Sequence, residues 1–271
     1  MKQYFTPALM LILAACNGSS NDGANNAEDN NNPAPSAISY NIVKVYPHDT
    51  SSYTQGLIWY NNTLYEGTGN YGKSKLLKLD ISNGKAGKEV SLDKKFFGEG
   101  IAIFHDKIYQ LTWKENKVFV YDLNTFKKIQ EFDWPFEGWG ITTDGKELII
   151  STGSNNLYFV NPDNFKINNI VGVFDNYGPA ADLNELEYIN GYVYANKFET
   201  NYILKINPET GKVEGKLDMS GLLEKSGKAF NPQEYDVSTG NVLNGVAFDS
   251  AKNSLYITGK QWPVLFEVKI N

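Results

Sequence analysis

The folded part of the chain consists of short apolar runs that alternate with turn signals. From Ile38 onward, runs rich in Tyr, Phe, Val, Ile and Leu are separated by pairs such as Asn61-Asn62 and Asp144-Gly145. Short runs of this kind between Asn, Asp and Gly residues are typical of β-hairpins. No sustained helical period runs along the chain. The pattern therefore predicts an all-β fold.

One strand-turn-strand phrase recurs five times. Its copies begin at Gly56, Gly100, Gly140, Glu185 and Gly245, so the first three start 44 and 40 residues apart. This period is the length of a four-stranded propeller blade. A third strand and a more polar fourth strand follow each of the first four copies. The repeat therefore predicts a five-bladed β-propeller.

The fifth copy is one strand short, because the chain ends after the run that contains Leu265 to Val268. An unpaired sheet edge invites pairing with other chains, and propellers close their ring to remove it. The apolar run from Tyr40 to Val45 precedes the first copy and can supply the missing strand. We therefore expect this N-terminal strand to close the propeller.

The first 15 residues have the pattern of a signal peptide with a lipobox. Lys2 precedes an apolar run from Phe5 to Ala15, and the run ends in Leu-Ala-Ala followed by Cys16. The run is too short for a permanent membrane span, and lipoprotein signal peptidases cut before such a cysteine. We expect export and lipidation at Cys16, with anchoring to the bacterial cell envelope at the periplasm or cell surface. The alternative is a plain secretory signal.

Residues 16–38 are predicted to be a flexible linker, and 39–271 the propeller domain. The linker is rich in Asn, Asp, Ala, Gly, Ser and Pro up to about Ala37, and it contains no aromatic residue up to that point. Such a composition buries too little apolar surface to fold. We expect the linker to hold the domain away from a membrane that it meets only through the lipid anchor.

Charge and composition restrict the classes of partner and metal. The 31 acidic and 25 basic side chains give a formal charge of −6, which argues against a nucleic-acid partner. The single cysteine excludes an intrachain disulfide and a thiolate zinc cluster. The chain has only His48 and His105 and lacks a His-Glu-x-x-His motif, so we expect no catalytic zinc. We interpret His48 as a turn or packing residue.

The repeat register brings two sets of residues to one face of the propeller. The first strand of each blade is innermost and the second runs antiparallel to it, so the start of one and the end of the other meet. The residues before the five phrases are Gln55, Glu99, Trp139, Asn184 and Asn244. The second strands carry a two-residue signature such as Leu64-Tyr65, and the residues four positions beyond its end are Gly69, Trp113, Gly153, Phe198 and Lys260. A carboxylate, an ammonium, amides and aromatic rings around one channel mouth predict a ligand site, although each could instead pack or cap a blade.

Several phrases resemble those of plant-type glutaminyl-peptide cyclotransferases, a family that also occurs in bacteria. The resemblance extends from about Pro47 to Ile270, in order and with compatible spacing. It implies an aminoacyltransferase that converts N-terminal glutamine of peptides or proteins to pyroglutamate and releases ammonia. The phrases are Tyr53-Thr54-Gln55-Gly56-Leu57, Phe97-Gly98-Glu99-Gly100-Ile101, Leu111-Thr112-Trp113, Gly138-Trp139-Gly140, Leu183-Asn184-Glu185-Leu186-Glu187-Tyr188, Leu243-Asn244-Gly245 and Thr258-Gly259-Lys260-Gln261-Trp262-Pro263.

The same resemblance assigns roles to individual residues. It implies that Glu99 is the acid/base residue and that the substrate pocket is lined by Gln55, Trp113, Trp139, Asn184 and Lys260. Two positions depart from the family pattern, because Phe198 stands where the family has tryptophan and Tyr53 where it has phenylalanine.

The reaction also requires a donor for the oxyanion that forms on the attacked carboxamide. Lys260, Gln55 and Asn184 are the candidates for this donor. Alternatively, Lys260 forms an ion pair with Glu99 and does not contact the oxyanion.

The glycines on either side of Glu99 could admit substrate or merely permit a tight strand entry.

Two other functions remain open from the residues alone. One is a metal-dependent hydrolase or lactonase in which Glu99, Asn184 and Asn244 hold a divalent ion. The other is a propeller that binds peptides without catalysis, because a fold does not fix function.

We expect a monomer that requires no cofactor. A structural calcium in the channel stays an open alternative, because the side-chain oxygens of Asn and Glu are suitable calcium ligands.

Overall fold

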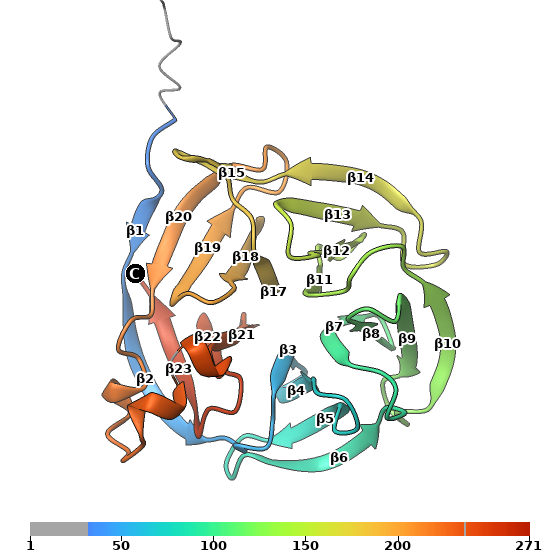
Figure 1. Cartoon of the computed structure of the whole chain (residues 1–271), viewed down its shortest axis with the longest axis horizontal. Helices are drawn as coiled ribbons and strands as arrows, with labels where there is room; N and C mark the ends of the chain where they lie inside the picture. The colour runs from blue at the N-terminus through green and yellow to red at the C-terminus, as the bar shows by residue number, and fades with distance from the viewer. Residues whose placement is uncertain (1–31, 236) are drawn as a thin grey trace, which may run out of the picture. The chain divides into compact units, whose positions relative to one another are not determined.

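Five β-sheets are arranged as blades around a central axis (Figure 1). This computed structural model describes residues 32–235 and 237–271. The predicted signal peptide, the lipidation site at Cys16 and the linker as far as residue 31 lie outside the described residues. The five-bladed propeller predicted from the repeat is confirmed, and the closing strand is where the repeat predicts it.

Within each of the first four blades, the strands follow chain order from the axis outwards. Blade 1 consists of β3 (Thr54–Tyr60), β4 (Thr63–Thr68), β5 (Lys75–Asp80) and β6 (Lys85–Ser91). Blade 2 consists of β7 (Gly98–Phe104), β8 (Lys107–Thr112), β9 (Lys117–Asp122) and β10 (Lys128–Asp133). Blade 3 consists of β11 (Ile141–Thr143), β12 (Leu148–Ile150), β13 (Asn156–Val160) and β14 (Ile167–Gly172). Blade 4 consists of β17 (Leu183–Ile189), β18 (Tyr192–Lys197), β19 (Tyr202–Ile206) and β20 (Val213–Asp218).

Blade 5 combines the two ends of the chain. Its inner strands are β21 (Leu243–Asp249), β22 (Ser254–Gly259) and β23 (Val264–Ile270). Its outer strand is β2 (Tyr40–Pro47), which pairs antiparallel with β23 from Tyr40 opposite Ile270 to Pro47 opposite Val264. The main-chain hydrogen bonds of β2 therefore satisfy the edge that the truncated fifth repeat would leave open.

Burial decreases from the axis to the rim. Strand β7 is almost entirely buried, whereas β10 in the same blade is mostly exposed. This gradient explains why the fourth strands β6, β10 and β14 are more polar. The inner strands β3, β7, β11, β17 and β21 contact one another in that order, and β21 contacts β3 to complete the ring.

Glycines allow the inner strands to approach closely. A Cβ atom on Gly98 would lie 2.7 Å from the carbonyl oxygen of Thr68, and one on Gly100 would lie 2.6 Å from that of Trp139. Side chains at these two positions would collide with the backbone of neighbouring blades. The glycines that flank Glu99 therefore serve tight strand packing, and neighbouring backbone occupies the room that a substrate would need there.

Large aromatic side chains fill the spaces between blades. Trp134 is 1% exposed, and its ring meets those of Tyr158 and Phe165 edge-on at centroid distances of 5.6 and 5.7 Å. Such pairs contribute about 0.5–1.5 kcal/mol each beyond the burial of their area. They fix blade 2 against blade 3 just before the chain enters β11.

The predicted linker is wrong at its C-terminal end. Residues Ser36–Ile38 form β1, which pairs parallel with β20 and adds a fifth strand to the blade 4 sheet. The side chain of Ile38 occupies the space above Gly215. Composition cannot signal such pairing, because main-chain hydrogen bonds need no apolar side chains and the partner strand is distant in sequence.

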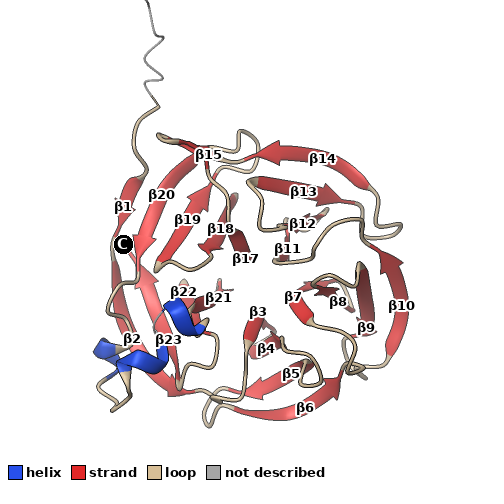
Figure 2. Cartoon of the chain, viewed as in Figure 1, coloured by secondary structure: helices blue, strands red, loops and turns tan. Residues whose placement is uncertain are grey.

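The remaining elements lie in two connections. A short hairpin of β15 (Phe174–Asp175) and β16 (Gly178–Pro179) precedes blade 4. In the described residues before blade 5 lie the 3-10 helices η1 (Glu224–Ser226), η2 (Pro232–Tyr235) and η3 (Val237–Thr239). Figure 2 shows helical ribbon beside β2, β22 and β23. None of the helices in the described part of the chain has the length and apolar character needed to cross a bilayer.

Candidate active site

A cavity of about 240 Å³ lies where the inner strands begin and the second strands end. All eight residues predicted for the catalytic and substrate site line it, and every blade contributes at least one of them. The lining residues are Tyr53, Gln55, Asn70, Phe97, Glu99, Trp113, Trp139, Asn184, Phe198 and Lys260. The repeat register therefore predicted the face of the propeller that carries the cavity. The chemical roles of these residues are taken up as proposals below.

Irregularities at the start of four inner strands determine where the polar residues point. The pairing register of the inner strand shifts at this position in blades 1, 2, 4 and 5. A β-bulge leaves a residue outside the regular ladder and redirects its side chain, and such bulges are frequent beside active sites. The residues within these four shifts include Gln55, Glu99, Asn184 and Asn244.

A chain of hydrogen bonds orients the amide of Gln55 toward Glu99. The Nδ2 group of Asn244 donates to the carbonyl oxygen of Thr54 at 2.9 Å and to Oε1 of Gln55 at 3.1 Å. Because Oε1 of Gln55 is thereby engaged, its Nε2 group faces Glu99 and donates to Oε1 of that carboxyl at 3.0 Å. Asn244 does not line the cavity, so the structure places this rim residue as a support for Gln55.

Glu99 and Lys260 are buried ionisable groups that influence each other. Their exposed fractions are 4% and 3%. Burial raises the pKa of Glu99 well above its ordinary value; the charge of Lys260 acts against this rise, and the charges of Glu137 and Glu115 add to it. Burial lowers the pKa of Lys260 to about 8, although the charges of Glu99 and Glu199 oppose this change. Perturbed pairs of this kind are typical of catalytic sites.

The Lys260 ammonium is held among aromatic faces. Its Nζ atom lies 4.7 Å from the ring centroid of Phe198 and 4.9 Å from that of Tyr53. Cation–π contacts at this distance stabilise a desolvated ammonium by about 2 kcal/mol. The buried lysine therefore contacts both Phe198 and Tyr53 through cation–π interactions.

Asn184 carries a polar atom without a partner. The residue is 2% exposed, and its Oδ1 atom is buried and receives no hydrogen bond from the described residues. An unsatisfied buried acceptor costs about 1–3 kcal/mol. Because Asn184 lines the cavity, a ligand N–H group is the partner that this position can accommodate.

The aromatic walls are seated on glycines. A Cβ atom on Gly69 would lie 2.4 Å from the ring of Phe97, and one on Gly153 would lie 2.6 Å from the indole of Trp139. The ring of Trp139 also meets that of Phe198 edge-on, at a centroid distance of 5.4 Å. These two glycine positions of the rim therefore support the walls and do not face a ligand.

Sequence reasoning missed Phe97 and Asn70 as lining residues. Phe97 lies two positions before Glu99, as Tyr53 lies two positions before Gln55, so the repeat register contained the signal. Its ring meets those of Trp113 and Tyr53 at centroid distances of 5.5 and 6.2 Å. Asn70, next to a glycine after β4, offered no comparable signal.

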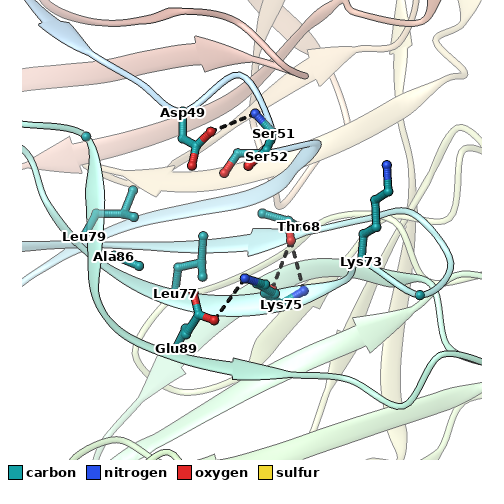
Figure 3. Close-up of a pocket in the computed structure, with 12 residues that line it drawn as sticks. Asp49, Ser51, Ser52, Thr68, Lys73, Lys75, Leu77, Leu79, Ala86 and Glu89 are labelled. Atoms are coloured by element: carbon teal, nitrogen blue, oxygen red, sulfur yellow. Dashed lines mark hydrogen bonds and ion pairs between the residues drawn. The ribbon is translucent and has the colours of Figure 1, made fainter.

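A second cavity, of about 300 Å³, lies beside blade 1 and away from these groups (Figure 3). Its polar side chains bond mainly with their neighbours: Nζ of Lys75 donates to Glu89 at 2.9 Å, and Asp49 accepts from the backbone N–H of Ser51 at 2.8 Å. Thr68 accepts from the backbone N–H of Lys75 at 2.9 Å. Its polar groups therefore do not converge on a free centre as Glu99, Lys260 and Asn184 do.

The described residues supply no obvious metal centre. Within residues 32–235 and 237–271, no three or more His, Cys, Asp and Glu side chains are grouped so that they could hold a metal ion. Of the three residues in the metal-binding alternative, Glu99 and Asn184 line the cavity, whereas Asn244 lies behind it and donates through its Nδ2 group to Thr54 and Gln55. His48 is buried outside the cavity, beside Glu66.

Known proteins resemble this chain across most of its length. The model of the glutamine cyclotransferase family matches residues 10–270. A glutaminyl-peptide cyclotransferase of Arabidopsis thaliana is 37% identical over 235 residues, which cover 84% of this chain and 70% of the relative. The crystal structure of Myxococcus xanthus glutaminyl cyclase is similar with a TM-score of 0.79 and 32% identity, and the match covers 88% of this chain and 98% of that one.

Proposed function

Because this chain belongs to the glutamine cyclotransferase family, we propose that it converts the N-terminal glutamine of peptides or proteins to pyroglutamate and releases ammonia. The observation that carries the proposal is the buried carboxyl of Glu99, which lies with Lys260 in an aromatic-walled cavity. Such a cavity suits an uncharged glutaminyl side chain beside a cationic α-amine.

The reaction is an intramolecular acyl transfer. The α-amine nitrogen attacks the γ-carboxamide carbon of the same residue, so that a C–N bond forms and a tetrahedral intermediate appears. Collapse of the intermediate breaks the bond to the amide nitrogen, which leaves as ammonia. Because the nucleophile is already tethered, the aromatic walls contribute by folding the side chain into the reactive conformation.

Glu99 is the group that can move the protons. An α-ammonium has a pKa of roughly 7.7–8.0 and must lose a proton before it attacks. A carboxylate whose pKa is raised by burial is a stronger base than an exposed one, and it can accept this proton. In its protonated form it can deliver that proton to the leaving amide nitrogen, while the second proton lost by the attacking nitrogen passes to solvent. The hydrogen bond from Gln55 fixes the carboxyl during both steps.

Charge separates Lys260 from the other two candidates for the oxyanion donor. Gln55 already directs its Nε2 group at Glu99, and the amide of Asn184 is a neutral donor that also carries an unpartnered acceptor. Lys260 bears a positive charge at neutral pH, because the pKa of its ammonium is about 8. We therefore assign stabilisation of the oxyanion to Lys260.

The decisive experiment is an ammonia-release assay on the full chain with a peptide that begins with glutamine. The same peptide with an acetylated α-amine is the matched control, because it lacks the nucleophile. Ammonia from the first peptide and none from the second supports the proposal. Binding of the first peptide without ammonia release would instead indicate a non-catalytic propeller.

We further propose that turnover needs no zinc, since the described residues supply no suitable group of ligands. Activity that survives dialysis against a zinc chelator supports this proposal. Activity lost on dialysis and restored by zinc would contradict it and favour the metal-dependent alternative.

Export and lipid anchoring are a separate proposal that rests on the sequence before Cys16, with the apolar run from Phe5 to Ala15 and its Leu-Ala-Ala-Cys ending. If they hold, the substrates are peptides or proteins of the cell envelope or beyond it.

A further inference from the structure

Glu137 accepts hydrogen bonds from the indoles of three tryptophans. Its Oε2 atom accepts a hydrogen bond of 2.8 Å from the indole Nε1 of Trp113 and one of 3.1 Å from that of Trp139. Its backbone carbonyl oxygen accepts a third, at 3.3 Å, from the indole of the buried Trp134. The side chain of Glu137 therefore bonds to two walls of the cavity, and its backbone carbonyl bonds to a tryptophan of the core.

The two walls come from different blades. Trp113 follows β8 of blade 2, and Trp139 precedes β11 of blade 3. Contacts with Phe97 and Phe198 restrain the planes of the two rings, but an indole can still swing or flip within a packed slot. A hydrogen bond at Nε1 selects one orientation. An acceptor shared by both indoles also fixes the two walls relative to each other.

We propose that Glu137 is a positioning residue, which holds the indoles of Trp113 and Trp139 in the arrangement that the glutaminyl substrate requires. This inference rests on the proposed cyclotransferase activity. Glu137 does not line the cavity, so it acts through the two tryptophans. The repeat register points to the same position, because Glu137 lies two residues before Trp139 as Tyr53 lies two before Gln55.

The carboxylate suits this role better than a neutral group. An ionised carboxylate only accepts hydrogen bonds, and bonds to a charged acceptor are roughly twice as strong as neutral ones. Lys114 keeps a positive charge beside it, with Nζ 3.9 Å from Oε1 of Glu137 and 3.9 Å from the ring centroid of Trp113. Both Glu137 and Lys114 are substantially exposed, so their ion pair contributes little by itself.

The charge of Glu137 has a second effect, on Glu99. The charged groups that act on Glu99 are Lys260, which lowers the pKa of its carboxyl, and Glu137 and Glu115, which raise it. Tyr53 and Tyr71 also lie within electrostatic range. Removal of the Glu137 charge should therefore move the acid limb of the pH profile of kcat/KM to lower pH. A residue with a merely structural role would not move this limb.

The test compares Glu137→Ala, which removes the acceptor, with Glu137→Gln, which keeps an acceptor oxygen and removes the charge. Because misplacement of reacting groups can cost up to about 10²-fold, Glu137→Ala should lower kcat/KM by about 10- to 100-fold with a Gln-initiated peptide. Glu137→Gln should recover most of that loss and show the shifted acid limb. The matched control is Glu131→Ala, because Glu131 is a glutamate of the outer strand β10 whose partners are Lys117 and Lys128. This control should keep native activity.

A double-mutant cycle isolates the path through the indoles. In a chain that carries Trp113→Phe and Trp139→Phe, no indole N–H remains for Glu137 to accept from the two walls. The effect of Glu137→Ala should then shrink to a small fraction of its effect in the native chain. An undiminished effect in that background, or native kcat/KM in Glu137→Ala, overturns the inference.

Two further measurements keep the test decisive. If Glu137→Ala does not fold, Trp113→Phe with Trp139→Phe takes its place, and native kcat/KM in that chain overturns the inference. Quenching of tryptophan fluorescence by acrylamide reports indole mobility without reference to turnover. It should increase in Glu137→Ala relative to the native chain, and increase less in Glu137→Gln, which keeps an acceptor oxygen. Unchanged quenching in both variants contradicts the inference. Absence of ammonia release by the native chain would instead refute the proposed function.

Discussion

The side chains of Gln55 and Glu99 are joined by a hydrogen bond of 3.0 Å across the boundary between blade 1 and blade 2. Both residues lie where the register of an inner strand shifts, and Asn244 of blade 5 holds the amide of Gln55 in the orientation that makes the bond. The carboxyl that we assign to proton transfer is therefore placed by three blades together.

The first prediction concerns Glu99. Glu99→Gln keeps the shape of the side chain and removes its basicity, so kcat should fall by roughly 10²–10⁴, the usual range for general acid–base catalysis. The affinity for peptide should change much less, because the amide still fills its place in the cavity. Steady-state ammonia release with a Gln-initiated peptide measures both quantities. Near-native turnover in the variant would require another base.

Glu187→Gln is the matched control for this experiment. Burial raises the pKa of Glu187 to about 8, so it resembles Glu99 in electrostatic terms. It does not line the cavity, however, and its carboxylate accepts a hydrogen bond of 2.9 Å from the backbone N–H of Phe248 in blade 5. The folded variant should retain turnover and keep its melting temperature at neutral pH, because the fold disfavours the ionised form of Glu187 and the neutral amide avoids that penalty. A loss of kcat equal to that of Glu99→Gln would mean that the effect is not specific to Glu99.

The second prediction concerns Lys260. Because burial lowers the pKa of its ammonium to about 8, the lysine loses its charge as the pH rises through about 8. If the charged form stabilises the oxyanion, kcat should decline above this pH. Lys260→Arg keeps a permanent cation and should remove the alkaline decline, whereas Lys260→Met should lower kcat at every pH. Profiles of kcat against pH for the three chains check this. An alkaline decline that persists unchanged in Lys260→Arg would assign it to another group.

The third prediction concerns the stability of the boundary between blade 1 and blade 5, where the ring closes. His48 and Glu66 form hydrogen bonds at this boundary. The Nε2 atom of His48 lies 3.2 Å from Oε1 of Glu66 in blade 1, and its Nδ1 atom lies 2.8 Å from the carbonyl oxygen of Trp262 in blade 5. Burial alone would lower the pKa of His48, but the charge and hydrogen bond of Glu66 and the Trp262 carbonyl outweigh it and raise the pKa.

A raised folded-state pKa means that the imidazolium stabilises the fold below the ordinary histidine value of about 6.5. This contribution should be lost as the pH rises through the higher folded-state pKa. Glu66→Ala leaves the buried histidine without its carboxylate and should lower the free energy of unfolding by about 3–5 kcal/mol. Denaturant unfolding at several pH values measures both effects. A native stability that does not depend on pH in this range would exclude a charged His48.

The fourth prediction concerns the N-terminal segment. Cys16→Ala removes the thiol that the lipobox offers for lipidation, so the variant should leave the membrane fraction. The propeller should remain folded, because Cys16 precedes every described residue. Fractionation in high salt, with the circular dichroism of the purified chain as the control for folding, measures both. A variant that still sediments with membranes would contradict the lipid-anchor proposal.

The sequence by itself determined the topology and most of the cavity. The five-fold phrase set the number of blades, and the truncated fifth copy set the pairing of β2 with β23. These features follow from local patterns, since alternation of apolar and polar residues and the turn pairs act within a few residues. The register also placed Glu99, Trp139 and Lys260 on one face, because residues at equivalent repeat positions meet around the axis of a closed ring.

Only the tertiary structure decided how these residues cooperate. Asn244 and Gln55 are 189 residues apart in the chain, and their hydrogen bond exists because the last blade closes against the first. The glycines beside Glu99 contact the backbone of neighbouring blades, and Glu137 reaches tryptophans of two blades at once. A repeat pattern encodes which face a residue occupies, but the partner of a polar atom depends on bulges and on the curvature of the ring. These act over distances that no local pattern records.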